Sequence, residues 1–192
     1  MQKPFLGRYT PQTLWSLFLM CALPQHIWTL LLAFNDISWL TDRTNSWDAI
    51  GVLCYGLLFA FVESVLVFIV AAILGLLIPK NWEQNRRLAL LGTFAIVLAI
   101  WGIVSQTYFL LGWRVPDAWM GFLVQSGHPA RYIYSVLVVM VAATFLLPAW
   151  AVLRQGRGLK FLNALIDRLG MLMILYLVFD FAALIVVVIR NL

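Results

Sequence analysis

Residues 49–78 read AIGVLCYGLLFAFVESVLVFIVAAILGLLI, thirty residues in which Glu63 is the only charged side chain. A helix rises about 1.5 Å per residue and the hydrocarbon layer of a bilayer is about 30 Å thick, so about 20 apolar residues are enough to cross it. This stretch is therefore long enough to cross as a helix, with tilt or with a turn that projects beyond the membrane.

The rest of the chain repeats this pattern. Of its 192 residues 64% are hydrophobic and 11% are charged, too few charges to cover a soluble fold of this size. The runs are continuous, whereas strands of a membrane barrel alternate apolar and polar residues. We therefore predict an all-α integral membrane protein, one multi-pass domain over residues 1–192 with five transmembrane helices in a compact bundle. The predicted spans are residues 14–34, 49–78, 88–113, 132–153 and 169–189.

The basic residues predict the orientation, because Lys and Arg near span ends are retained on the cytoplasmic side. Nine of the thirteen fall on the side of the N-terminus: Lys3, Arg8, Lys80, Arg86, Arg87, Arg154, Arg157, Lys160 and Arg168. The other four are Arg43, Arg114, Arg131 and Arg190. We expect a cytoplasmic N-terminus and an extracytoplasmic C-terminus. The net charge of +5 is then a topology signal that favours anionic lipid headgroups, and nucleic acid is not an expected partner.

The connecting segments carry three local expectations. Ser46 is the expected N-cap of the second span. Residues 114–131 contain the apolar letters WMGFLV but are too short to span, which suggests an interfacial or partly re-entrant segment, placed as a lid over the polar zone described below. Residues 158–168, GLKFLNALIDR, have apolar side chains at helical spacing, and we expect a short helix lying on the membrane surface.

Two carboxylates fall inside spans, where an ionisable side chain costs at least about 2.5 kcal/mol. Glu63 lies fifteen residues from Asp48, and Asp180 lies ten residues from Arg190, so both are expected in the membrane interior. No Lys or Arg lies at that depth, and at least one carboxyl is expected to be the neutral acid that donates a hydrogen bond to Gln106, Tyr176 or a backbone carbonyl.

Other polar side chains fall at a similar level of the predicted bundle. His26 lies eight residues before Phe34 and Gln106 seven residues before Trp113, which places both about 10–12 Å from the extracytoplasmic end. A polar pocket or hydrogen-bonded network is therefore predicted there. It is built from the candidate site residues Glu63, Asp180, His26, Gln106 and Tyr176. A pair between His26 and one of the carboxylates is a sensible partnership, although helix order is not readable from the sequence.

Packing between helices is the competing role for these acids. Gly56, Ala60 and Ser64 recur every four residues beside Glu63, a stripe of small side chains that lets two helices approach closely. In the fifth span Asp180 follows Tyr176 by one turn. The two roles, a helix or subunit contact and a proton, ion or headgroup site, both remain open from the sequence.

Motifs of known catalytic centres are missing from the sequence. There is no zinc-binding spacing of His and Cys, no GxSxG, no P-loop and no GxGxxG, so no catalytic residue, no metal and no cofactor is predicted. Of the two histidines, His128 precedes Pro129 in a loop, which argues against haem held by two histidines. A single haem or chlorophyll ligand at His26 stays open. The five-span layout resembles the membrane portion that precedes the extracellular catalytic domain in lipoteichoic-acid-synthase-type transferases, and this resemblance covers topology alone.

Three functions follow as expectations. The first is a non-catalytic subunit or accessory factor of a larger membrane assembly in the cell (inner or plasma) membrane, with the lipid bilayer and one or more membrane proteins as partners. The second is a small carrier or lipid-binding protein that uses Glu63 and Asp180. A membrane enzyme with His26 or Glu63 as general base has only residue types in its favour, and we expect no enzyme.

Overall fold

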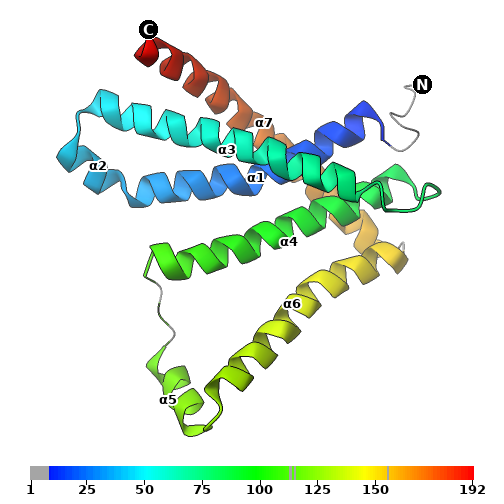
Figure 1. Cartoon of the computed structure of the whole chain (residues 1–192). Coiled ribbons are helices and arrows are strands. Elements are labelled where there is room, and N and C mark those ends of the chain that lie inside the picture. The colour runs from blue at the N-terminus through cyan, green and yellow to red at the C-terminus, as the bar shows by residue number, and fades with distance from the viewer. Residues whose placement is uncertain (1–8, 113, 115, 155) are drawn as a thin grey trace.

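The computed structural model describes residues 9–112, 114, 116–154 and 156–192, and only the backbone of residues 39–41. These ranges form seven helices (Figure 1): α1 Pro11–Asn35, α2 Ile37–Arg43, α3 Ser46–Leu74, α4 Gln84–Leu110, α5 Asp117–Gln125, α6 Pro129–Arg154 and α7 Arg157–Asn191. Five of them, α1, α3, α4, α6 and α7, are long and apolar enough to cross a membrane. The predicted helical chain with five such segments is confirmed. Lys3, Arg8 and Trp113 lie outside the described residues.

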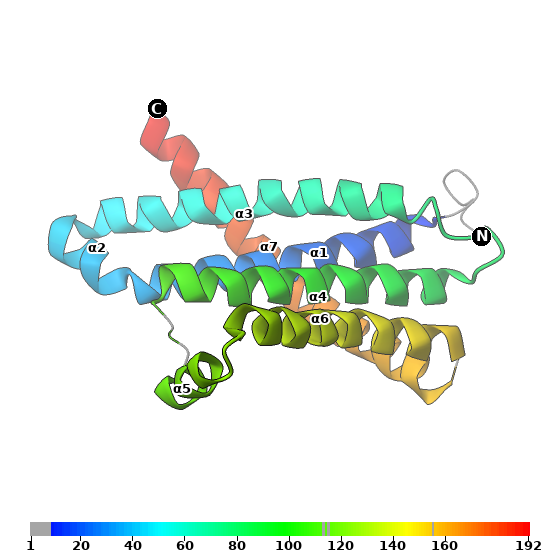
Figure 2. The same ribbon diagram turned by 60° about the horizontal axis from the view of Figure 1, so that its bottom comes forward.

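The bundle is organised around α1. This helix packs against α3, α4 and α7, while α6 lies at the edge against α4 and α7. The five long helices alternate in direction, so the start of α1 and the finish of α7 lie at opposite ends of the bundle (Figure 2). We call the end that holds α2, α5 and the finish of α7 the α2 end.

Local side-chain chemistry sets where the helices begin. The Thr10 hydroxyl accepts a hydrogen bond from the Thr13 backbone N–H at 3.2 Å, and Pro11 opens α1 at a position where its missing N–H costs nothing. At α3 the cap is Asn45, whose side-chain oxygen accepts from the Asp48 N–H at 2.9 Å. The expected cap at Ser46 was wrong by one residue, because asparagine satisfies the free N–H groups as well as serine does.

The helix bounds differ from the predicted spans, most clearly at the end of α3 and at the start of α7. The second span was expected to reach Ile78, but α3 ends at Leu74 and Gly75 starts a series of turns. The short surface helix expected over residues 158–168 is not separate: it is the first third of α7, which runs unbroken for 35 residues. Neither proline nor a glycine pair lies between Arg157 and Asn191, so nothing interrupts the backbone hydrogen bonds.

The loop helix α5 does not cover the interior of the bundle. Its nine residues are mostly exposed, and among the described elements it contacts α6 alone. Figures 1 and 2 both show it beside the start of α6, away from α1 and α3. The expected lid over a polar zone is therefore not present in this arrangement.

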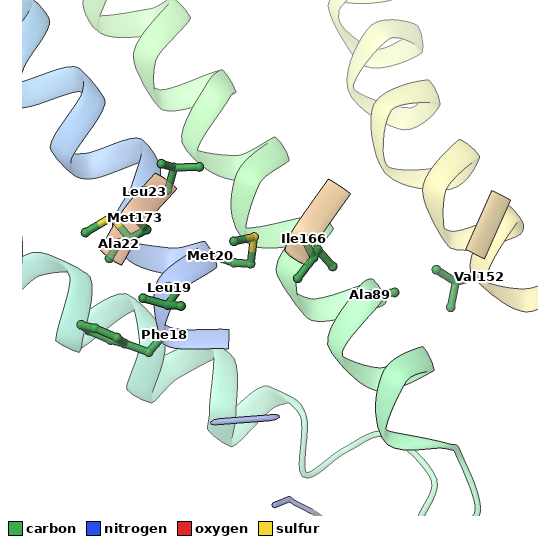
Figure 3. Close-up of a cluster of buried hydrophobic side chains, with 9 residues drawn as sticks. All are labelled: Phe18, Leu19, Met20, Ala22, Leu23, Ala89, Val152, Ile166 and Met173. Atoms are coloured by element: carbon green, nitrogen blue, oxygen red, sulfur yellow. The ribbon is translucent and has the colours of Figure 1, made fainter. Parts of the chain in front are cut away.

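The largest cluster of buried apolar side chains joins α1 to α4, α6 and α7 (Figure 3). It consists of Phe18, Leu19, Met20, Ala22, Leu23, Ala89, Val152, Ile166 and Met173. The stripe of small residues predicted on α3 is turned into the bundle: Ala60 and Ser64 are buried, and a Cβ on Gly56 would lie 3.4 Å from Thr29 of α1. Close packing of α1 and α3 fixes the position of the polar side chains on both helices.

Candidate functional site

His26 of α1 and Asp180 of α7 form a buried pair in the interior of the bundle. The Nε2 atom of His26 lies 2.8 Å from Oδ2 and 3.0 Å from Oδ1 of Asp180. The exposed fraction is 0% for His26 and 6% for Asp180, so both groups are buried. Nine residues separate His26 from Asn35 at the end of α1, which places the pair about 13 Å below the α2 end.

The other ring nitrogen decides how protons are arranged in this pair. His26 Nδ1 lies 2.8 Å from the backbone oxygen of Ala22, and a carbonyl oxygen can only accept, so Nδ1 carries a hydrogen and donates it. A hydrogen bond between Nε2 and the carboxyl group then requires one further proton between the two groups. That proton lies either on Nε2, which gives imidazolium and carboxylate, or on Asp180, which gives imidazole and carboxylic acid. Both arrangements have no net charge, and this explains how two ionisable side chains occupy an apolar interior.

The surroundings of the pair are apolar and closely packed. The Tyr176 ring, one turn before Asp180, lies with its centroid 6.3 Å from that of His26 and packs against the main apolar cluster. Ala183, one turn after Asp180, is 2% exposed. Neither of the two cavities described below is lined by His26 or Asp180. The pair therefore joins α1 to α7 and lines neither cavity.

Glu63 is placed differently. It is half-buried on α3, and within the described part of the chain its carboxyl group makes no hydrogen bond or ion pair. Val67, Val70 and Leu74 follow it at spacings of four, seven and eleven residues, which keep to one face of a helix. These three side chains line a groove, so Glu63 extends the same face by one turn toward the α2 end.

The groove lies between α3 and α4 with α1 as its floor, and it encloses about 680 Å³. Its walls are almost entirely apolar, and two glutamines, Gln25 of α1 and Gln106 of α4, supply polar groups. A second hollow of about 410 Å³ lies between α1 and α3 at the α2 end, where Asp36 borders it. Volumes of this order suit a small ligand or part of a helix.

Contacts between helices give the relative depths of these polar groups. Gly56 of α3 meets Thr29 of α1, and the two helices are antiparallel, so Gln25 and Glu63 lie on the same side of that contact. Gln25 is four residues and Glu63 seven residues away from it, a difference in depth of about 4–5 Å. Both side chains therefore lie near the middle of the spans.

Gln106 lies much nearer the α2 end. The sequence placed it about 10–12 Å from a span end at Trp113, but α4 ends at Leu110, and the four intervening residues correspond to about 6 Å. The side chain is exposed. The five predicted site residues therefore do not form one network: His26, Asp180 and Tyr176 meet between α1 and α7, while Glu63 and Gln106 lie on the face that carries the groove.

One buried charge was not singled out in the sequence. Arg87, in the first turn of α4, is 1% exposed, and its Nη2 donates to the Pro79 oxygen at 3.0 Å. Its guanidinium lies 5.5 Å from the centre of the Tyr9 ring, and the Tyr9 hydroxyl donates to the Ala72 oxygen at 3.0 Å. These contacts join the start of α1 to the turn between α3 and α4. Arg87 is one of two adjacent arginines at a span end. In the sequence, such a pair cannot be told apart from the basic residues that set the topology.

Metal or cofactor ligation finds little support in the described residues. No group of three or more His, Cys, Asp and Glu side chains there lies close enough to hold a metal ion. Both ring nitrogens of His26 are already engaged by Ala22 and Asp180, so the imidazole has no free lone pair for a haem or chlorophyll. The same engagement argues against His26 as a general base for an external substrate.

Comparison of the chain with protein-family models, with characterised proteins and with solved structures found no match.

Proposed function

We propose that this protein is a non-catalytic subunit or accessory factor of a larger membrane assembly, embedded in the cell (inner or plasma) membrane with its N-terminus in the cytoplasm. The single observation that carries the proposal is that Glu63 has no pairing partner within the described chain. An acid near the middle of a span has an unfavourable free energy in lipid unless another group pairs with it. Asp180 has such a partner in His26, whereas Glu63 has none within the described chain.

The contrast between the two acids separates a structural role from an intermolecular one. The buried pair joins helices of this chain, and its two side chains are hydrogen-bonded to each other. Glu63, by contrast, is partly exposed on the side of the bundle that carries the groove. A group that is polar, accessible and without an internal partner is expected where a second protein completes the interaction.

The proposal is tested by quantitative co-purification. The tagged wild-type protein, Glu63→Gln and the matched control Glu83→Gln are extracted from the host membrane into lipid discs, and co-purifying proteins are quantified against one another. Glu83 is exposed and lies in the loop before α4, so the control makes the same chemical change outside the spans. We expect one protein at a fixed ratio with wild type and control, reduced severalfold with Glu63→Gln. Recovery of no stoichiometric protein with any of the three would refute the subunit role.

A carrier or lipid-binding role is the second candidate, and the groove of about 680 Å³ favours it. In that case Glu63 would exchange a proton or hold a cationic group, and a solitary protein in lipid discs would retain a pH-dependent activity. Native mass spectrometry distinguishes the two, because a carrier retains a bound small molecule after every protein partner has been removed.

A further inference from the structure

We infer that the groove between α3 and α4 is the docking site for one transmembrane helix of a different protein, and that this helix carries a lysine or arginine near its middle, opposite Glu63. The inference rests on the subunit role proposed above and adds the surface and the chemistry of the partner. It is supported by the depth of the polar groups, the shape of the groove, the charge of Glu63 and the positions of the basic residues of this chain.

The depth of Glu63 in the bundle favours a transmembrane helix over a lipid as the occupant of the groove. Glu63 lies eleven residues from the end of α3 at Leu74, about 16 Å inside the helix, and Gln25 lies at nearly the same level. Lipid headgroups stay at the membrane surface, and at this depth a lipid offers only its hydrocarbon tails. A transmembrane helix can place a polar side chain at any level, with its other residues against the apolar walls of the groove.

The shape of the groove also suits a helix. α1 contacts both α3 and α4, whereas α3 and α4 touch each other only sparsely, so α1 forms a floor between two walls. Gln25 of the floor and Gln106 of one wall offer amide groups at two levels of the same groove. Interhelical hydrogen bonds of this kind stabilise helix association in lipid.

Charge complementarity argues against a second copy of this chain as the occupant of the groove. Arg86, Arg87, Arg131, Arg154 and Arg190 lie in the first or last turns of spanning helices, and Arg168 lies where α7 enters its apolar part. His26 is committed to Asp180. Among the residues that the structure describes, a second copy therefore presents no Lys or Arg at the level of Glu63. A lysine or arginine on another protein would neutralise the acid and be neutralised by it.

The docking chemistry is tested with designed helices and the full chain. Purified protein in lipid discs is titrated with polyleucine transmembrane peptides that carry a single central lysine or a central leucine, and binding is followed by energy transfer. We expect the lysine peptide to bind the wild-type protein about tenfold more tightly than the leucine peptide. Glu63→Gln should remove that preference and Glu83→Gln should leave it unchanged. Equal binding of the two peptides to the wild-type protein would overturn the inference without relying on any variant.

Cross-linking in host membranes separates failure of the docking site from failure of the subunit role. A photoreactive residue is placed either at Leu98, in the groove and 60% exposed, or at Val138 on α6, 66% exposed. We expect Leu98 to cross-link a protein whose sequence has a mid-span lysine or arginine, and Val138 to cross-link lipid. A stoichiometric partner reached only from Val138 would retain the subunit role and overturn the docking site. Cross-linking of Leu98 only to lipid, or to a second copy of this chain, would also overturn the docking site.

Discussion

Replacement of Asp180 by leucine or by asparagine should have very different effects on stability. Asp180→Leu leaves His26 Nε2 buried with no partner, and a buried polar atom without a hydrogen bond costs about 1–3 kcal/mol. Measured interhelical hydrogen bonds in membranes average about 0.6 and reach about 1.7 kcal/mol, because the unfolded helices also find partners in lipid. We therefore expect a loss of about 1–2 kcal/mol. Asp180→Asn should change the free energy of unfolding by less than about 0.5 kcal/mol, since the amide N–H can donate to Nε2 of a neutral imidazole.

The assay is reversible unfolding by dodecyl sulfate in mixed micelles, followed by circular dichroism. The variants His26→Leu and His26→Leu/Asp180→Leu complete a double-mutant cycle, in which the interaction energy is expected at about 1 kcal/mol. A leucine variant as stable as the wild type would refute the proposed contribution of the pair. So would an asparagine variant as damaging as the leucine one, because it would show that charge and not hydrogen bonding holds α1 to α7.

Three further predictions concern other parts of the fold. Glu63→Gln should leave the unfolding free energy within about 0.5 kcal/mol of wild type in the same assay, because Glu63 has no partner inside the described chain. Gly75→Ala should destabilise the fold by about 1–3 kcal/mol, since the added methyl would overlap the Tyr9 hydroxyl. Tyr9→Phe in that background should recover part of the loss. If the effects of the two substitutions on the unfolding free energy simply add, this contact is contradicted. Spin labels at positions 160 and 185 should lie about 38 Å apart along an unbroken α7, whereas a clearly shorter distance would indicate two separate helices.

The spans were predictable because a membrane helix is specified by one continuous property, the apolar run, which needs no knowledge of any other part of the chain. The ends were less predictable. Helix α3 ends at Leu74, four residues before the end of the apolar run, and α7 begins well before its apolar part. The length of a helix depends on hydrogen bonds that continue through polar residues, and hydropathy does not record them.

The candidate site was predictable as a set of residue types and not as an arrangement. The cost of burying His26, Asp180 and Glu63 marks them in any sequence of this kind. The histidine pairs with Asp180 because α1 lies against α7 at that level. The spacing of residues in the sequence does not show which helices are neighbours. Arg87 was missed for a related reason: it lies against Tyr9, which is more than seventy residues away in the sequence.

The most direct test of the subunit role is the mass of the particle that carries this protein after gentle extraction in native lipid discs. The chain alone has a mass of 21.8 kDa. We expect a larger particle in which a second polypeptide is present at a fixed ratio to this one. A particle that contains a single copy, or only copies of this chain, would contradict it.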